Sequence, residues 1–146
     1  PLRSREDMNA LIEGVKDGTI DVIATDHAPH SKEEKSKGLK GSAMGVVGLE
    51  TAFGVLNTKL VKTGIISLEK LIDMMSVKPR EIFDISGGKI ELGAPADLAL
   101  LDIDKEWCVD PEKFVTMGRA TPFQDWKLQG ENLLTIYKGE IVYEAL

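Results

Sequence analysis

Residues 19–30 read TIDVIATDHAPH and hold the strongest structural signal in the chain. The first part, residues 19–25, is short and rich in β-branched side chains, which is typical of a buried strand. Directly after it come an acidic residue and both histidines of the chain, Asp26, His27 and His30. In parallel α/β folds, catalytic groups gather at the carboxyl ends of strands. We therefore predict a strand over residues 19–25 that leads into a functional loop.

Helical patterns lie on both sides of this segment. Ser4 is a favourable helix N-cap with Asp7 three residues later, as in a capping box, and apolar residues at helical spacing continue until Gly18. Later helices are predicted over residues 48–62, from Ser67 onward, and over residues 79–83, where Pro79 suits the first turn. This order of elements is that of a βα-unit, so the front half of the chain is assigned to the α/β class.

Residues 31–45 separate the predicted strand from the second helix. They are rich in lysine, glutamate and glycine and lack a regular apolar period. We therefore expect a mobile loop whose lysines are solvated, which is the usual state of a charged run on a protein surface.

The chain changes character after Ile85. Glycines then separate short runs of β-forming residues, and strands are predicted over residues 89–92, 96–101, 133–137 and 140–143, the last two joined at Lys138-Gly139. Trp107 and Cys108 lie in a further strand-like run, in which the cysteine is expected to be a small buried side chain. The expected division is an α/β segment over residues 1–85 and a β-rich segment over residues 86–146. Because a complete (β/α)8 barrel takes about 250 residues, the first segment would supply only the last strand and flanking helices of one.

The composition argues against several classes of function. The chain has 146 residues, 42% of them hydrophobic and 29% charged, with a net charge of −6. There is no basic stripe for a nucleic-acid partner and no run of about 18 apolar residues for a membrane span. The single cysteine fits a reducing cytoplasm. The chain starts at Pro1 without a methionine or an apolar leader, so we expect it to begin inside a longer protein.

The polar cluster after the predicted strand has two interpretations. An aspartate at such a place is often a turn or helix-cap residue, and a lone histidine is more often a satisfied core or surface residue than a ligand. Against this stands the spacing, because Asp26 and His30 are four residues apart across Pro29, which stiffens the turn. Both side chains can then face one cavity, where Asp26 would ligate a metal or act as a base.

The motif at residues 23–30, Ile-Ala-Thr-Asp-His-Ala-Pro-His, resembles the last-strand motif of the dihydroorotases in the amidohydrolase superfamily. Further segments resemble that family in the same order along the chain, at residues 1–3, 45–53, 88–98, 121–123 and 139–143. The resemblance implies the end of a (β/α)8 barrel followed by a β-sandwich segment. It also implies a zinc-dependent hydrolase of pyrimidine biosynthesis that opens the cyclic amide of dihydroorotate to carbamoyl aspartate and closes it again.

The resemblance also assigns roles to single residues. It implies that Asp26 ligates one of two zinc ions and carries the proton from the attacking hydroxide to the leaving nitrogen. It implies that His30 binds the substrate carboxylate. Main-chain groups of Met44 and Gly45 would bond the pyrimidine ring, although the family pattern Pro-Phe-Gly is Ala-Met-Gly here. For His27, a direct role and a packing role stay open.

The other metal ligands of that family, several histidines and a carboxylated lysine, have no counterpart in this sequence. We therefore expect an inactive C-terminal fragment of a small-molecule hydrolase. One rival assignment is a hydantoinase, dihydropyrimidinase or allantoinase, against which His30 argues because their rings lack the carboxylate. A second is a non-catalytic dihydroorotase-like partner of aspartate transcarbamoylase. A homo-oligomer and a cytoplasmic location are further expectations.

Overall fold

A computed structural model describes residues 3–145 of the chain. Pro1 and Leu2, which carry part of the resemblance at residues 1–3, lie outside the described residues. The chain forms two compact units. Within the described residues, the first comprises residues 3–24, Leu56–Asp102 and residues 132–145, and the second comprises Thr25–Val55 and Ile103–Glu131. The division expected at residue 85 remains a prediction.

The first unit begins with helix α1, Arg5–Asp17, as the sequence predicts. The Asp7 backbone N–H donates to the Ser4 hydroxyl at 3.2 Å, and the Ser4 N–H donates to the Asp7 carboxylate at 3.2 Å. This capping box satisfies backbone donors that have no partner inside the helix. Gly18 ends the helix in the left-handed conformation, with φ of 87°.

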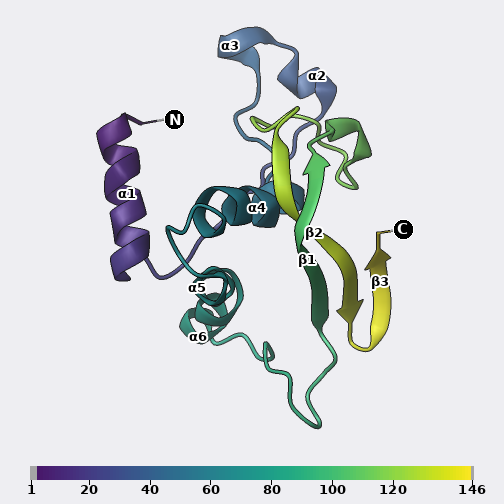
Figure 1. Cartoon of the computed structure of the whole chain (residues 1–146). Coiled ribbons are helices and arrows are strands. Elements are labelled where there is room, and N and C mark those ends of the chain that lie inside the picture. Colours follow the sequence, from purple (N-terminus) through teal and green to yellow (C-terminus); the bar gives the residue numbers. More distant parts are fainter. Residues whose placement is uncertain (1–2, 146) are drawn as a thin grey trace. The chain divides into compact units, whose positions relative to one another are not determined.

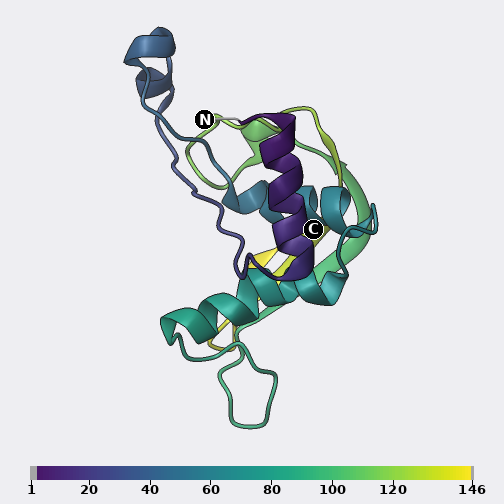
Figure 2. The same cartoon turned by 90° about the vertical axis from the view of Figure 1, so that its left-hand side faces the viewer.

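Three short helical elements follow one another without a break in the first unit. They are α5, Leu68–Ile72, the π-helical segment η2, Asp73–Val77, and α6, Lys78–Phe83. Figure 2 shows them as one continuous helix in teal. The third and fourth predicted helices are therefore a single run, because Val77 keeps helical dihedral angles of −74° and −56° ahead of Pro79. Leu71 and Met74 are its buried side chains.

A three-stranded sheet occupies the C-terminal part of the chain, in the order β1-β2-β3 (Figure 1). Its strands are β1, Leu98–Cys108, β2, Lys127–Tyr137, and β3, Glu140–Glu144. The antiparallel pair β2 and β3 is joined at Lys138 and Gly139, which have φ values of 52° and 84°. A two-residue hairpin turn of type I′ has positive φ at both positions, so this turn agrees with the predicted one. Strands β1 and β2 are longer than predicted.

Two predicted strands are wrong. Residues 89–92 have irregular and turn backbone, and the side chain of Leu92 is fully exposed. Residues 19–25 are also irregular, and in the first unit Ile23 makes a single backbone bond, donating to Met74 O at 3.3 Å. A strand exists through pairing with a neighbour, and the described residues offer neither segment a partner strand. Both segments have side chains that favour a strand, but they lack the backbone hydrogen bonds to a neighbouring strand that would make them one.

The core of the second unit packs against helix α4, Leu49–Leu56. Its buried apolar residues are Val47, Val109, Phe114 and Leu128, with Val55, Trp107 and Phe123 packed against them. A Cβ added to Gly54 would lie 3.0 Å from the Trp107 ring and 3.1 Å from Gly130 O, so glycine allows the helix to approach closely. Helix α4 continues into the π-helical segment η1, Asn57–Val61, which confirms the helix predicted over residues 48–62.

A second close approach in this unit involves Gly118. A Cβ there would lie 2.8 Å from Val47 Cγ1 and 2.9 Å from Pro29 Cβ. Val47 is 2% exposed, and its N–H donates to Ala120 O at 2.9 Å. The segment that follows the Asp-His-Ala-Pro-His motif is therefore anchored in the core by both its side chain and its backbone.

The aromatic side chains and the cysteine of this part of the chain differ in burial. Trp107 is half-buried against the core and donates its indole N–H to Gly130 O at 2.9 Å. Phe123 and Trp126 pack edge to face, with ring centroids 5.2 Å apart. Cys108, in contrast, is exposed, so its predicted burial is wrong. It lies on the last position of β1, where the alternation of the strand turns it outward.

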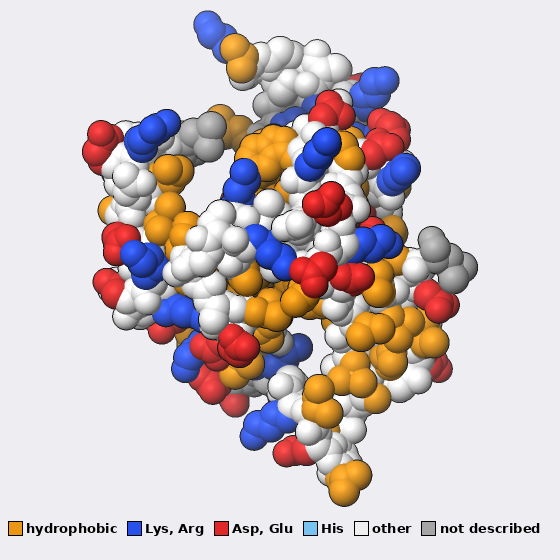
Figure 3. Space-filling model, viewed as in Figure 1, with side chains coloured by type: hydrophobic (Ala, Val, Ile, Leu, Met, Phe, Trp, Pro, Cys, Tyr) orange, Lys and Arg blue, Asp and Glu red, His pale blue; other side chains and the backbone are white. Residues whose placement is uncertain are grey.

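Apolar side chains also reach the surface over the sheet (Figure 3). Exposed members are Leu98, Leu100, Tyr137, Ile141 and Val142.

Within residues 3–145, no helix combines the length and apolar character that crossing a bilayer requires.

Candidate active site

Asp26 stands at the start of the second unit with an exposed side chain. Its backbone has φ of 48°, in the left-handed region, which aspartate tolerates better than most residues. Within residues 3–145 the carboxylate has neither a hydrogen bond nor an ion pair. The carboxylate is therefore available to bind a metal ion or a proton. Asp84 and Asp125 share this backbone region, so what distinguishes Asp26 is its place in the Asp-His-Ala-Pro-His motif.

His27 has a defined structural task. Its Nδ1 atom accepts hydrogen bonds from the backbone N–H groups of Gly48 at 3.0 Å and Leu49 at 3.2 Å. These are donors at the start of α4, which have no acceptor inside the helix. The backbone beside it pairs with residue 46, where Ala28 N–H donates to Val46 O at 2.9 Å. Of the two roles left open for His27, the geometry favours packing and helix capping.

His30 contacts the main chain of the segment that was expected to bind the substrate ring. Its Nε2 atom lies 2.7 Å from Met44 O, so in this arrangement Nε2 carries the proton. Its Nδ1 atom lies 3.8 Å from the carboxylate of Glu34. The ring is 27% exposed. The structure thus brings together two residues that are fourteen positions apart and for which the resemblance implies substrate binding.

Gly45 is the residue at which this segment passes closest to the motif. Its φ is 129°, and an added Cβ would lie 2.6 Å from Ala28 Cβ and 3.2 Å from His30 Nε2. No side chain fits there without a shift of the backbone. Met44, just before it, has a side chain that is 94% exposed, so only its main chain takes part in the arrangement.

The segment from Ser31 to Gly45 is more ordered than the sequence predicts. It contains the helices α2, Lys32–Lys35, and α3, Gly38–Gly41. Helix α2 begins with a capping box, in which the Ser31 N–H donates to the Glu34 carboxylate at 2.8 Å. That bond, the Ser31 hydroxyl and the neighbouring His30 lower the pKa of Glu34 below its ordinary value. Residues 31–45 were expected to form a mobile loop, and the two helices within them correct the part of that expectation that concerns regular structure.

Lys35 is the residue of this segment that sequence reasoning missed. Its Nζ atom donates to Ala43 O at 2.9 Å and to Gly45 O at 2.8 Å, and its side chain is half-buried. The expectation that all lysines here are solvated is wrong for this one. Ser31 and Glu34 stand three residues apart, which is the spacing of a capping box. This signal would have predicted the helix that directs Lys35 inward.

The donor set on this chain does not complete a metal site. Within residues 3–145 there is no cluster of three or more histidine, cysteine or acidic side chains that could enclose an ion. His27 Nδ1 is occupied by backbone N–H groups, and His30 Nε2 is occupied by Met44 O. Asp26 therefore fits as one ligand of a metal, and the residues described here do not form a site with two ions by themselves.

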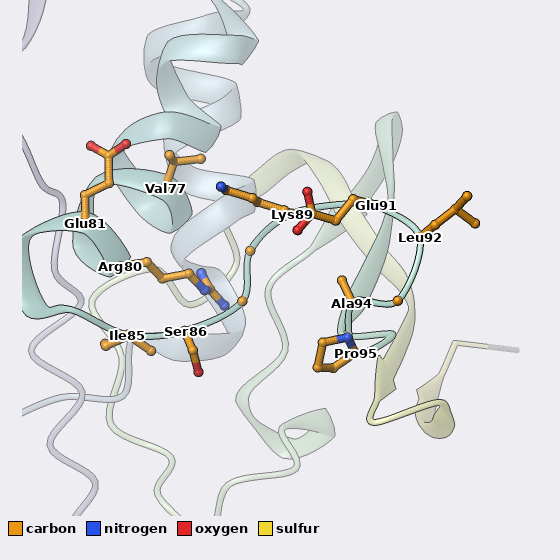
Figure 4. Close-up of a pocket in the computed structure, with 13 residues that line it drawn as sticks. Val77, Arg80, Glu81, Ile85, Ser86, Lys89, Glu91, Leu92, Ala94 and Pro95 are labelled. Atoms are coloured by element: carbon orange, nitrogen blue, oxygen red, sulfur yellow. The ribbon is translucent and has the colours of Figure 1, made fainter.

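A hollow in the described surface lies elsewhere in the chain. It has a volume of about 590 Å³ and is lined by α6 and the glycine-rich segment after it, including Arg80, Ser86, Lys89 and Pro95 (Figure 4). The Arg80 guanidinium donates to the Ser76 carbonyl and hydroxyl at 3.0 and 2.8 Å. None of the predicted site residues lines this hollow.

Comparison with known proteins identifies the family. The model of the amidohydrolase family matches residues 2–142. The chain belongs to the amidohydrolase family. Among curated amidohydrolase relatives, it is 51% identical to the dihydroorotase of Bacillus caldolyticus and 53% identical to that of Brevibacillus brevis, each over 144 residues. Both alignments cover 99% of this chain and 34% of the relative, so the chain spans about a third of the length of the curated relatives it matches.

A solved amidohydrolase-type structure agrees with the fold. The L-hydantoinase (dihydropyrimidinase) from Arthrobacter aurescens matches with a TM-score of 0.88 and 34% sequence identity. The match covers 99% of this chain and 33% of that protein. The hydantoinase-like fold of the described residues is therefore established, as a small α/β piece with a three-stranded sheet.

Proposed function

We propose that this chain is the C-terminal part of a dihydroorotase, which hydrolyses the cyclic amide of dihydroorotate to carbamoyl aspartate and catalyses the reverse ring closure. The observation that carries the proposal is identity of 51% and 53% to two dihydroorotases over 99% of the chain. The contact between His30 and the Met44 main chain supports it, because both were expected to bind the substrate. In this proposal residues 1–85 end a (β/α)8 barrel and residues 86–146 belong to a β-sandwich.

Asp26 is the proposed catalytic residue of this chain. Its exposed carboxylate would take a proton as the ring amide is attacked and return it to the leaving nitrogen. Zinc, with two ions in the complete active site, is the proposed cofactor that supplies the nucleophile, and Asp26 is the ligand that this chain contributes. Because one carboxylate cannot hold two metal ions, the isolated chain is proposed to be inactive.

His30, Met44 and Gly45 are proposed to bind the substrate. A histidine N–H is suited to a carboxylate, because a hydrogen bond to an ionised group is stronger than a neutral one. In the present arrangement Nε2 donates to Met44 O, so the substrate carboxylate would replace this carbonyl as the acceptor. The main chain at Gly45 would approach the ring closely because there is no side chain between them.

A hydantoinase or dihydropyrimidinase is the second candidate, favoured by the structural match to the Arthrobacter aurescens enzyme. Allantoinase falls in the same group. His30 counts against these activities, because hydantoin and dihydrouracil rings lack the carboxylate that it would bind. A non-catalytic partner of aspartate transcarbamoylase is a third candidate, against which the unoccupied carboxylate of Asp26 counts. A cytoplasmic location and a homo-oligomeric state are further parts of the proposal.

A substrate panel on the full-length parent protein tests the proposal. Ring opening of dihydroorotate, dihydrouracil, hydantoin and allantoin would be measured in parallel, with added zinc. We expect kcat/KM for dihydroorotate to exceed that for dihydrouracil by at least about 10², as for a site whose buried polar groups need the missing substrate group. A preference for hydantoin or dihydrouracil would support the second candidate. No turnover of any ring would support the non-catalytic one.

A further inference from the structure

The carbonyl groups of three successive residues are each bonded by a side chain from residues 30–35. Met44 O accepts from His30, and the carbonyls on either side of it, Ala43 O and Gly45 O, accept from Lys35. An ammonium group has three N–H donors, and Lys35 uses two of them to bond these carbonyls. Because its side chain is half-buried, Lys35 acts here as a cross-link rather than as solvated charge.

This arrangement restrains a part of the chain that would otherwise be loose. Glycine has few steric limits, so the backbone at Gly45 can occupy many conformations besides the observed φ of 129°. The Lys35 ammonium group bonds Ala43 O, before Met44, and Gly45 O, after it. These two bonds fix the peptide planes on both sides of Met44. Lys35 itself is held at the end of α2, where Ser42 donates its hydroxyl to Lys35 O at 2.8 Å.

The restraint leaves the donors of the same segment open. Within residues 3–145, the N–H groups of Met44 and Gly45 have no acceptor, whereas the Ala43 N–H donates to Glu34 O at 3.1 Å. The carbonyls of residues 43–45 are thus satisfied by side chains, while two adjacent N–H groups have no acceptor among the described residues. These N–H groups could donate hydrogen bonds to the carbonyl oxygens of a ring-shaped ligand.

We propose that Lys35 is a positioning residue, whose ammonium group clamps the carbonyls of Ala43 and Gly45 and so holds the Met44–Gly45 main chain ready for the substrate ring. This inference rests on the proposed function of that segment. Lys35 acts through the main chain and does not touch the reacting atoms. It differs in this from the other lysines of the segment, of which Lys40, on α3, is exposed.

The test compares Lys35→Met with Lys40→Met in the full-length parent protein. We expect amide hydrogen exchange of Ala43, whose N–H donates to Glu34 O, to rise about tenfold or more in Lys35→Met, because the clamp that holds this residue in place is lost. We expect KM for dihydroorotate to rise about tenfold, with kcat changed less than KM. Lys40→Met should match the unaltered protein in both measurements.

A chemical rescue keeps the test valid if Lys35→Met folds poorly. Lys35→Cys, in a Cys108→Ser background that removes the exposed native thiol, would be alkylated with bromoethylamine to restore an ammonium group of near-native length. Recovery of both exchange protection and KM supports the clamp. Unchanged exchange in the unalkylated cysteine variant overturns it, and so does lost protection without a change in KM. Failure of the proposed function is distinct, because then the unaltered parent does not open dihydroorotate.

Discussion

The Nδ1 atom of His27 lies 3.0 Å from the backbone nitrogen of Gly48 and accepts its hydrogen bond. A second bond comes from Leu49 N–H at 3.2 Å, so one imidazole serves two donors at the start of α4. The side chain thereby joins the Asp-His-Ala-Pro-His motif to the helix that follows the segment of Met44 and Gly45. Its removal should loosen both.

His27→Ala is expected to lower the free energy of unfolding by about 1 kcal/mol, the usual loss when a helix N-cap acceptor is removed. The measurement is urea unfolding, repeated in a Leu49→Pro background. Proline suits the first position of a helix and removes one of the two N–H donors. The loss from His27→Ala should therefore be smaller in that background, and an equal loss in both would contradict the capping role.

Gly45→Ala is expected to destabilise the protein by about 1 to 3 kcal/mol and to abolish most activity. The added Cβ would meet Ala28 Cβ at 2.6 Å and Ala28 O at 2.8 Å, in addition to the strain of positive φ. Gly64→Ala is the matched control, because Gly64 also has positive φ, 74°, but has open space around the added atom. If both variants lose equal stability, close packing at Gly45 is not the cause.

Asp26→Asn is expected to reduce kcat of the parent enzyme by about 10² or more, the usual contribution of a general acid–base group. Asparagine tolerates the left-handed backbone of this position, so the change should remove the charge and leave the fold intact. Asp21→Asn, an exposed carboxylate in the preceding segment, serves as the control. A near-normal rate for Asp26→Asn would remove it from the catalytic assignment.

His30→Ala is expected to weaken binding of dihydroorotate and of carbamoyl aspartate by about 10- to 100-fold. This is the loss of one charge-assisted hydrogen bond, about 1.5 to 3 kcal/mol. Dihydrouracil, which lacks the carboxylate, should be affected much less, and steady-state KM and inhibition constants would measure both. Equal losses for all rings would mean that His30 supports the Met44 main chain instead.

The capping box of α2 should respond to acid. The Ser31 N–H, then the Ser31 hydroxyl, lower the pKa of Glu34 below its ordinary value of 4.5. A lowered pKa in the folded state means that the contribution to stability is present above pH 4.5 and is lost as the pH falls through the lowered pKa. The amide resonance of Ser31 should therefore titrate below pH 4.5. Glu34→Gln should abolish that titration and Glu33→Gln should leave it in place.

The helices could be predicted from sequence because their signals are local. Ser4, Gly18 and Ser67 mark ends with their own side chains or dihedral angles, and no distant residue is needed to read them. The prediction of a strand over residues 19–25 failed for the opposite reason. Its side chains favour a strand, but a strand is made by a neighbour, and no local pattern tells whether one is present.

The candidate site shows the same division. The motif at residues 23–30 was enough to select Asp26 and His30, whose roles remain predictions. The contact between His30 and Met44 was not predictable, because it depends on how α2 and α3 turn the chain back on itself. Lys35 was missed because a lysine-rich run was taken as solvated, although helix α2 turns this one toward Gly45 O.

The contact of Gly118 with Val47 and Pro29 limits how this part of the molecule can change over evolution. An atom added at Gly118 meets Val47 Cγ1 at 2.8 Å and Pro29 Cβ at 2.9 Å, so a larger residue there requires both a smaller side chain at position 47 and a backbone shift at position 29. Position 47 is two residues from Gly45, and position 29 is next to His30. Among related sequences these three positions should therefore covary, and a substitution fixed for stability at one of them would carry an inherited shift in substrate affinity.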